Sequence, residues 1–354
     1  MKKLLALFIL TVFLASCNSP SYSTLFSVKR TDYGYIVKIK DNGKVRTYYL
    51  SRHPRKGQIK IPVSRVIVLS STHIGFISDL GQVDKIIGVS GKKYIYSPIL
   101  RKHLNSITEV GFENSLNLEK ILSLHPDVIF TYSLNNTDEK KIALMEKAGI
   151  TVVPVYEYLE NAPLARAKWL EVFGAFFDKY DTARTIFNNI ERRYNREKVY
   201  VKKFISRLNH KTKVLANIPY RGVWYVPSGK SYMAQLIMDA GGDYPWANTT
   251  SQMSIPLDFE TVFTMASDAD VLINPNTATS LQQVIATDKR LKRIRAIRLG
   301  KVYNFTKKMS PGGGFAFWEN GVVEPDKILH DLIAIFYPNS IFAKDSLYYY
   351  KKLN

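Results

Sequence analysis

The chain has 354 residues, of which 46% are hydrophobic and 23% are charged. These values exclude a disordered chain, and the length allows two domains with full cores. The single cysteine excludes an intrachain disulfide, and the formal net charge of +20 indicates nucleic acid, an anionic membrane surface or an anionic ligand as partner.

The first residues have the pattern of an export signal. Lys2 and Lys3 precede an apolar run at residues 4–15, which is too short to span a bilayer comfortably. The run ends in Leu-Ala-Ser before Cys17, which resembles the lipobox of bacterial lipoproteins, where the cysteine sulfur is diacylated after cleavage. We expect a signal peptide at residues 1–16 and lipid attachment at Cys17; the alternative is a free thiol in a discarded peptide. Export argues against a nucleic acid partner.

A β-hairpin is expected ahead of the first lobe. Residues 33–40 and 44–50 alternate between apolar and polar side chains, and Asn42-Gly43 lies between the two runs. Asn-Gly in this position is a strong signal for a hairpin. We assign residues 17–60 to a lipidated tether followed by this hairpin.

Strand and helix patterns alternate over residues 61–178, which predicts an α/β lobe with parallel strands. Strands are expected at residues 65–70, 85–89, 108–111, 127–132 and 150–155, and helices at residues 73–80, 117–124, 138–148 and 163–177.

Residues 179–210 contain neither glycine nor proline, and their apolar side chains recur at a spacing of three and four. This pattern predicts an amphipathic helix, and at about 1.5 Å per residue it would reach roughly 45 Å. We predict a rigid connecting helix between two lobes that enclose a cleft; the alternative is an ordinary packed helix.

Residues 211–354 repeat the plan of the first lobe. Strands are expected at residues 213–217, 270–274 and 301–304, and helices at residues 231–240, 258–266, 281–286 and 325–336. The predicted fold is therefore α/β, with two Rossmann-like lobes joined by one long helix and an N-terminal hairpin extension.

One short pattern occurs in both halves. Residues 117–122 and 258–263 each begin with Asn or Asp and carry a glutamate two positions later, Glu119 and Glu260, and each helix leads to an aspartate and an apolar strand. An acid in the first helical turn stabilises the helix dipole, so each glutamate has a local explanation. Its recurrence in equivalent places favours a docking role.

From about residue 61 to residue 338 the chain resembles the class III periplasmic binding proteins of ABC importers. The matching stretches are residues 65–73, 117–132 and 239–244; residues 160–169 and 318–329 are most similar to members from Bacteroides-type bacteria. The resemblance implies a monomeric, lipid-anchored protein on the periplasmic side of the envelope. It also implies that Glu119 and Glu260 meet arginine pockets on an ABC permease dimer. The implied ligand is an iron chelate such as a ferric siderophore; haem or a corrinoid is the alternative.

Ligands of open α/β sheets bind beyond the carboxyl ends of the strands. The candidates at these ends are Thr72, His73, Tyr94, Tyr132, Arg221, Trp224, Trp246 and Trp318. Aromatic rings would stack on a macrocycle, and an arginine would pair with a carboxylate or catecholate. The alternative is that the aromatic side chains cap the core, and that His73 is a structural helix-start residue. Phe315-Ala316 replaces an Asn-Asp pair of relatives, which makes this contact more apolar.

No catalytic motif is apparent. The sequence has no Gly-x-Ser-x-Gly elbow, no His-Glu-x-x-His and no phosphate loop, and residues 311–314 are glycine-rich without dinucleotide spacing. We expect no catalysis, no cofactor and no metal site, because the histidines and acids do not converge. A lipid-anchored hydrolase is a second alternative.

Overall fold

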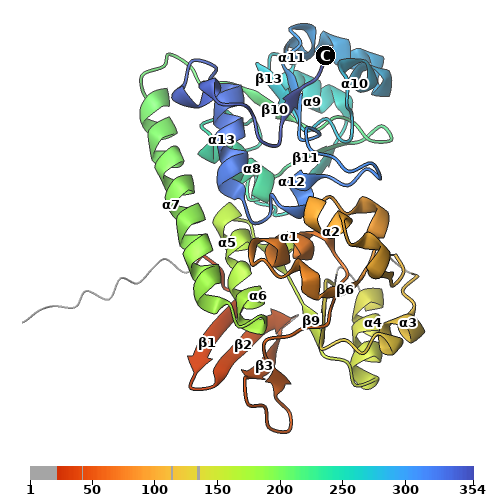
Figure 1. Ribbon diagram of the computed structural model, residues 1–354. Coiled ribbons are helices and arrows are strands. Elements are labelled where there is room, and N and C mark those ends of the chain that lie inside the picture. Colours follow the sequence, from red (N-terminus) through yellow and green to blue (C-terminus); the bar gives the residue numbers. More distant parts are fainter. Residues whose placement is uncertain (1–21, 42, 113–114, 134–135) are drawn as a thin grey trace, which may run out of the picture.

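The computed structural model describes residues 22–354 except residues 42, 113–114 and 134–135, so the predicted signal peptide and Cys17 lie outside the described residues. Figure 1 shows two α/β lobes, one above the other, beside the long helix α7 (Tyr180–Ile205), with an antiparallel sheet at the lower end. Two Rossmann-like lobes, one connecting helix and an N-terminal extension confirm the predicted fold.

The first lobe is built on a five-stranded parallel sheet in the order β7-β6-β5-β8-β9. Its strands are β5 (Val66–Val68), β6 (Ile86–Val89), β7 (Thr108–Glu109), β8 (Val128–Thr131) and β9 (Val152–Pro154). The central strand β5 is a run of three β-branched residues with no exposed surface. All five strands lie within the ranges expected from the sequence.

The first lobe's helices agree with expectation except for one break and for a short helix at residues 98–101 that was not expected. They are α1 (Ser71–Asp79), α2 (Pro98–Arg101), α3 (Leu118–Ser123), α4 (Asn136–Lys147), α5 (Pro163–Lys168) and α6 (Leu170–Phe176). The single helix predicted at residues 163–177 is broken at Trp169, whose amide donates to Arg166 O at 3.1 Å, three residues back. The fully buried indole donates to the carboxylate of Glu160 at 3.2 Å, so tertiary contact fixes the break.

The second lobe's main sheet has the order β10-β13-β14-β15. Strands β10 (Val214–Ala216), β13 (Val271–Ile273) and β14 (Val302–Asn304) are parallel and were expected. The antiparallel β15 (Lys351–Lys352) and the small sheet of β11 (Trp224–Val226) and β12 (Ile255–Leu257) were not. The helices are α8 (Tyr232–Asp239), α9 (Phe259–Ala266), α10 (Leu281–Thr287), α11 (Arg295–Arg298), α12 (Ala316–Glu319) and α13 (Pro325–Phe336).

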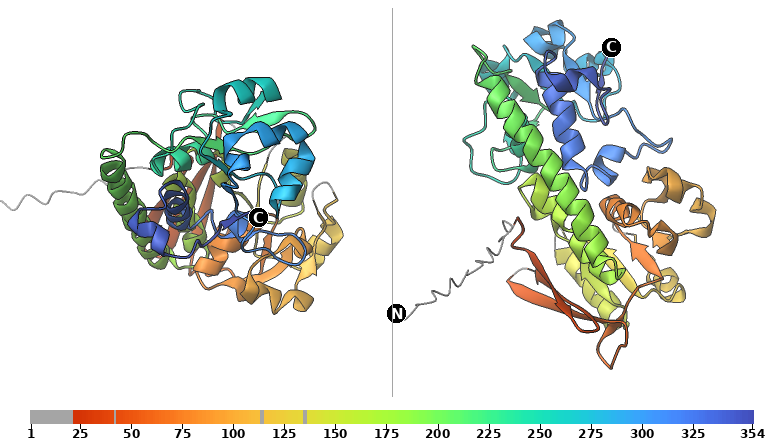
Figure 2. Two further views of the ribbon diagram at one scale, coloured as in Figure 1. Left: turned by 90° about the horizontal axis from the view of Figure 1, so that it is seen from above. Right: turned by 60° about the vertical axis from the view of Figure 1, so that its left-hand side comes forward.

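Helix α7 lies along both lobes and packs against α6 of the first and α13 of the second (Figures 1 and 2). Its buried stripe includes Ala183, Phe187, Ile190, Tyr194 and Val201, as the apolar spacing predicted. The helix ends five residues before the predicted limit, because bonds from the amides of Arg207 and Leu208 reach back only three residues.

The N-terminal extension is a four-stranded sheet in the order β1-β2-β3-β4. The predicted hairpin is present as β2 (Gly34–Asp41) and β3 (Lys44–Ser51). Strand β1 (Phe26–Thr31) lies antiparallel to β2, and the two-residue β4 (Ile59–Lys60) lies parallel to β3; neither was expected. The Phe26 ring packs 4.9 Å from the Trp169 ring, which attaches the sheet to the first lobe.

Among the described residues, the structure contains no helix with the length and apolarity needed to cross a membrane.

Candidate functional site

The lobes meet through a buried carboxylate. Glu319, at the end of α12 in the second lobe, is 1% exposed and accepts bonds from the backbone amides of Tyr96 and Ser97 in the first lobe, each at 2.7 Å. Burial raises the pKa of Glu319 to about 7, and the two amide donors oppose that rise. This contact holds the loop after β6 against the loop after β14.

Glycines allow the two backbones to approach at the same place. A Cβ atom on Gly314 would lie 1.5 Å from Tyr94 O, and one on Gly312 would lie 2.0 Å from Lys93 O. Any side chain at either position would therefore force the lobes apart. The glycine-rich stretch at residues 311–314, which has no dinucleotide spacing, serves this contact.

A groove of about 390 Å³ lies between the lobes beside this contact. The first lobe contributes Tyr96, Pro98, Arg101 and Lys102, and the second contributes Met309, Ser310 and Pro311. A hollow of about 480 Å³ is lined from the same first-lobe loop, with Lys93, Tyr94 and Phe112 among its residues. Both volumes fall in the range of small-molecule sites. The lining combines aromatic rings with cations.

Backbone amides hold Glu109, the acid that lines the hollow together with Lys93 and Tyr94. The Glu109 carboxylate accepts from the amides of Gly91 at 2.9 Å and Lys92 at 2.6 Å. Lys93 places its ammonium 4.7 Å from the centre of the Tyr94 ring. The charge of Glu109 is thus partly satisfied by amide donors, so the balance of the lining is positive.

Three predicted ligand residues belong to the core. His73, Trp224 and Trp246 are 0%, 0% and 4% exposed. Burial lowers the pKa of His73 to about 3, so this histidine is neutral, and its ring packs against Phe173. The Trp224 indole donates to Ala216 O at 3.1 Å. We therefore withdraw these residues as ligand candidates, because the side chains turn into the lobes rather than out of them.

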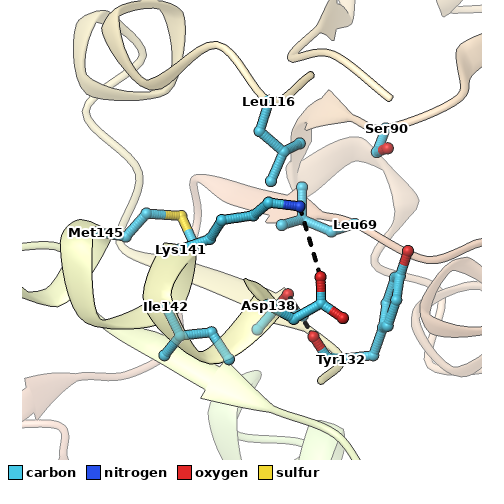
Figure 3. A pocket seen from close by; sticks show the side chains of 9 residues that line it. Leu69, Ser90, Leu116, Tyr132, Asp138, Lys141, Ile142 and Met145 are labelled. Carbon is cyan, nitrogen blue, oxygen red and sulfur yellow. Dashed lines mark hydrogen bonds and ion pairs between the residues drawn. The ribbon is translucent and has the colours of Figure 1, made fainter. Parts of the chain in front are cut away.

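Thr72 and Tyr132 lie at the carboxyl ends of first-lobe strands. The Thr72 hydroxyl donates to the buried Glu157 carboxylate at 2.7 Å, so it is committed to an internal bond. Figure 3 shows the Asp138 and Lys141 side chains, which form an ion pair, beside the Tyr132 ring. Tyr132 lines a cavity of about 20 Å³. This volume suits a single water molecule, so the cavity is too small for a chelate.

Arg221 is exposed at the tip of a tight turn. The backbones of Tyr220 and Val223 exchange two hydrogen bonds, of 2.8 and 3.1 Å, and Arg221 and Gly222 between them have φ values of 51° and 83°. Positive φ at both central residues is the mark of a type I′ turn, and it is uncommon for arginine. The guanidinium lies 5.3 Å from the Tyr220 ring, which is 57% exposed.

Trp318 is 48% exposed on α12, one residue before Glu319. Its ring packs against Phe317 at 4.8 Å and Phe305 at 5.3 Å, and Phe315 joins the same cluster. The apolar Phe315-Ala316 sequence thus supports the ring that remains accessible. The sequence did not predict three residues that line the groove, Arg101, Lys102 and Met309. They follow strand ends, which was the available signal, but no local pattern shows which loop residues face the other lobe.

Glu119 and Glu260 lie in the first turns of α3 and α9, one in each lobe (Figure 1). Their helices are capped as predicted: Asn117 accepts from the Lys120 amide at 2.9 Å, and Asp258 from the Thr261 amide at 2.7 Å. Both glutamates are exposed, and Glu260 also lies 3.2 Å from Arg290.

Within the described parts of the chain, no three histidine, cysteine or acidic side chains are grouped to hold a metal ion.

A family model described as a periplasmic binding protein matches residues 66–309, well over half of the chain. The chain belongs to the periplasmic binding protein family, and its relatives of known structure are substrate-binding proteins of the class III type, not enzymes.

An uncharacterized lipoprotein of Methanocaldococcus jannaschii is 30% identical over 304 residues, spanning 83% of this chain and 70% of that protein. Two solved structures share the fold at 17% identity. A periplasmic haem-binding protein from Pseudomonas aeruginosa has a TM-score of 0.60 and covers 78% of this chain and 94% of its own. An ABC-type Fe3+-hydroxamate transport protein from Saccharomonospora viridis has a TM-score of 0.58 and covers 83% and 98%.

Proposed function

We propose that this protein captures an anionic iron chelate of the ferric siderophore class between its lobes and delivers it to an ABC permease. The observation that carries the proposal is the inter-lobe groove, in which Tyr96 lies with Arg101 and Lys102. Aromatic faces favour stacking on catecholate or similar rings, and paired cations favour a ligand of negative charge. We retain Arg221, Tyr94 and Trp318 as candidate contacts, but not Thr72, whose hydroxyl is bonded to Glu157, or Tyr132, which lines a cavity too small for a chelate.

Haem is a second candidate, supported by one observation. Tyr96 and Met309 face the same groove from opposite lobes, and both residue types serve as axial ligands of haem iron. His73, a ligand candidate from the sequence, is buried and does not reach the groove. No observation of this kind supports corrinoid binding, which the titration below tests with cobalamin.

The test is a tryptophan-quenching titration of purified, lipid-free protein with a ferric catecholate, a ferric hydroxamate, haem and cobalamin. Because Trp318 is the half-exposed tryptophan nearest the inter-lobe contact, a bound iron chelate should quench its emission. The variant Trp318→Phe should lose most of the quenching and keep most of the affinity, measured by calorimetry. Failure of every ligand to bind would refute the proposal, and a Soret shift with haem alone would favour the second candidate.

Arg221→Asn is expected to have opposite effects on stability and binding. Asparagine tolerates positive φ, so the free energy of unfolding should rise by about 1 kcal/mol. Loss of the charge should weaken binding of an anionic chelate several-fold. Arg221→Lys is the matched control, which keeps both the charge and the strained backbone. Urea unfolding and the titration measure the two effects; unchanged affinity in the asparagine variant would remove Arg221 from the site.

Cys17→Ala is expected to release the protein from membranes. We propose that Cys17 carries the lipid, since the preceding residues resemble a lipobox and a relative is a lipoprotein. Fractionation of cells that produce each form should move the variant from the membrane pellet to the soluble envelope fraction. Retention in the pellet would contradict lipid attachment at this residue.

A further inference from the structure

The N-terminal sheet carries its arginines and three of its lysines, Lys29, Lys38 and Lys40, on opposite faces. The arginines turn towards the body of the protein and are paired: Arg30 with Asp181 of α7, Arg46 with Asp41 and Glu146, and Arg52 with Asp178 at 2.5 Å. These ion pairs attach the sheet to α4 and to the start of α7. The opposite face of the sheet takes no part in these ion pairs.

The opposite face carries lysines. Strand pairing places Lys29 opposite Ile36, Ile36 opposite Tyr49, Lys38 opposite Thr47 and Lys40 opposite Val45, and residues directly opposite one another share a face. The inward residues of β2, by contrast, are Tyr35, Val37 and Ile39, which are at most 3% exposed. We call the set Lys29, Ile36, Lys38, Lys40, Val45 and Tyr49 the lysine face.

The lysine face is exposed and has no carboxylate among its residues. The three lysines are exposed, Val45 is 58% exposed and Tyr49 is 49% exposed. Over the described residues, no ion pair joins Lys29, Lys38 or Lys40 to an acid. Residues 22–60 contain ten lysines and arginines but only two aspartates, and Asp41 is already paired with Arg46. Asp32 lines a hollow with Ile36 and Tyr49, but no ion pair among the described residues joins it to a lysine of this face, so the net charge of the face is positive.

We infer that the lysine face lies on an anionic phospholipid surface. Lysines beside a tyrosine and aliphatic side chains match the membrane interface, where ammonium groups meet headgroup phosphates and rings enter the boundary region. The choice of a membrane rests on the proposed lipid attachment at Cys17. The nine residues from Cys17 to Phe26 span at most about 30 Å, so an acylated cysteine keeps the sheet close to the bilayer.

The position of the sheet agrees with this role. It lies at the lower end of α7, away from the second lobe, and it precedes residues 66–309, which match the family model (Figure 2). The substrate groove is lined by residues 96–102 and 309–311, none of which belongs to the sheet. Membrane contact and ligand capture therefore use separate surfaces.

The test uses lipid-free protein carrying Cys17→Ala and its sedimentation with vesicles of phosphatidylcholine alone or with 30% phosphatidylglycerol. The wild-type face should bind the anionic vesicles, and K29E/K38E/K40E should weaken this binding about a hundredfold, since each lysine near such a surface contributes a few-fold to tenfold. The control K202E/K203E/K211E changes the charge equally at the other end of α7 and should bind as before.

Equal loss in both variants, or no preference of the parent protein for anionic vesicles, would overturn the inference. Binding to duplex DNA but not to vesicles would also overturn it. Circular dichroism and the midpoint of thermal unfolding establish that the variants fold, and K29E alone is the milder substitute where the triple variant does not. Chelate affinity should be unchanged in all of them, so failure here is distinguishable from failure of the proposed function.

Discussion

Replacing Glu119 and Glu260 together by arginine is expected to abolish uptake of the transported ligand while leaving its affinity for the isolated protein unchanged. Both side chains are exposed and neither lines the inter-lobe groove. The resemblance to class III binding proteins implies that each meets an arginine pocket on the permease. Two reversed charges would then face like charges, which disfavours the complex by several kcal/mol.

The two substitutions leave the helix caps in place, since Asn117 and Asp258 make the capping bonds. Loss of each acid from a first helical turn should lower stability by only about 0.3–1 kcal/mol. At position 260 an arginine would also meet Arg290, so Glu260→Gln paired with Glu119→Gln is a milder second variant. It should reduce uptake without adding repulsion.

Asp84→Arg with Asp345→Arg is the matched control. Asp84 lies in the first lobe and Asp345 in the second, their side chains are 65% and 68% exposed, and the change in net charge is the same. Uptake of radiolabelled iron chelate by whole cells and titration of purified protein are the two measurements. An equal loss of affinity and uptake, or an equal loss of uptake in the control, would show that these glutamates are not the docking pair.

Glu319→Ala is expected to loosen the groove side of the lobe contact and to lower the free energy of unfolding by about 3 kcal/mol. The substitution removes the carboxylate that accepts from the amides of Tyr96 and Ser97. Both amides then lack an acceptor in a buried position, which lowers stability. The lobes would remain joined along α7 and between α5 and α8, where the Arg166 guanidinium lies 4.1 Å from the centre of the Tyr232 ring. Urea unfolding should show a lower free energy of unfolding, and small-angle scattering should show a larger radius of gyration. Unchanged values would show that the Glu319 contact does not hold the lobes together.

The same carboxyl predicts how stability depends on pH. Its pKa in the folded protein is about 7, against an ordinary 4.5, so between these values the folded chain keeps a proton that the unfolded chain has released. The free energy of unfolding should therefore fall as pH rises from about 4.5 to 7, by about 3 kcal/mol in all, and stay level above.

Glu319→Gln, which cannot ionise, should remove this part of the slope. Other buried acids titrate in both proteins, among them Asp79, whose pKa burial also raises to about 7. The difference between variant and wild type isolates Glu319. Identical slopes between pH 5 and 8 would mean that the carboxyl does not titrate in this range.

Local signals were sufficient for most of the fold. Strand β5 is a short β-branched run, and Asn117 and Asp258 are capping residues whose neighbours repeat in both halves, so each could be recognised from a few adjacent residues. Strands β4 and β15, like the expected β7, have two residues each, so the local pattern for them is weak. They exist because a partner strand lies beside them, which depends on distant parts of the chain.

The position of the candidate site could be predicted from the sequence, but the residues that line it could not. Sequence reasoning placed ligand residues at the carboxyl ends of strands, where Tyr96 and the loop after β14 do meet. It could not give the direction of a side chain at such an end. Trp224 turns inward to bond Ala216 O, whereas Trp318 remains half-exposed, and no neighbouring residue distinguishes the two indoles.

The position of helix α7 between the lobes has a consequence for the unfolding of the protein. Its first half packs on the first lobe, where Lys168 lies over the Phe187 ring, and its second half bonds the second lobe through Tyr194 and Lys198, which both contact Asp239. Neither half of the protein has a complete hydrophobic interior without this shared element. Melting in a calorimeter should therefore be one cooperative event rather than two, and neither half should be obtainable as an independent fragment.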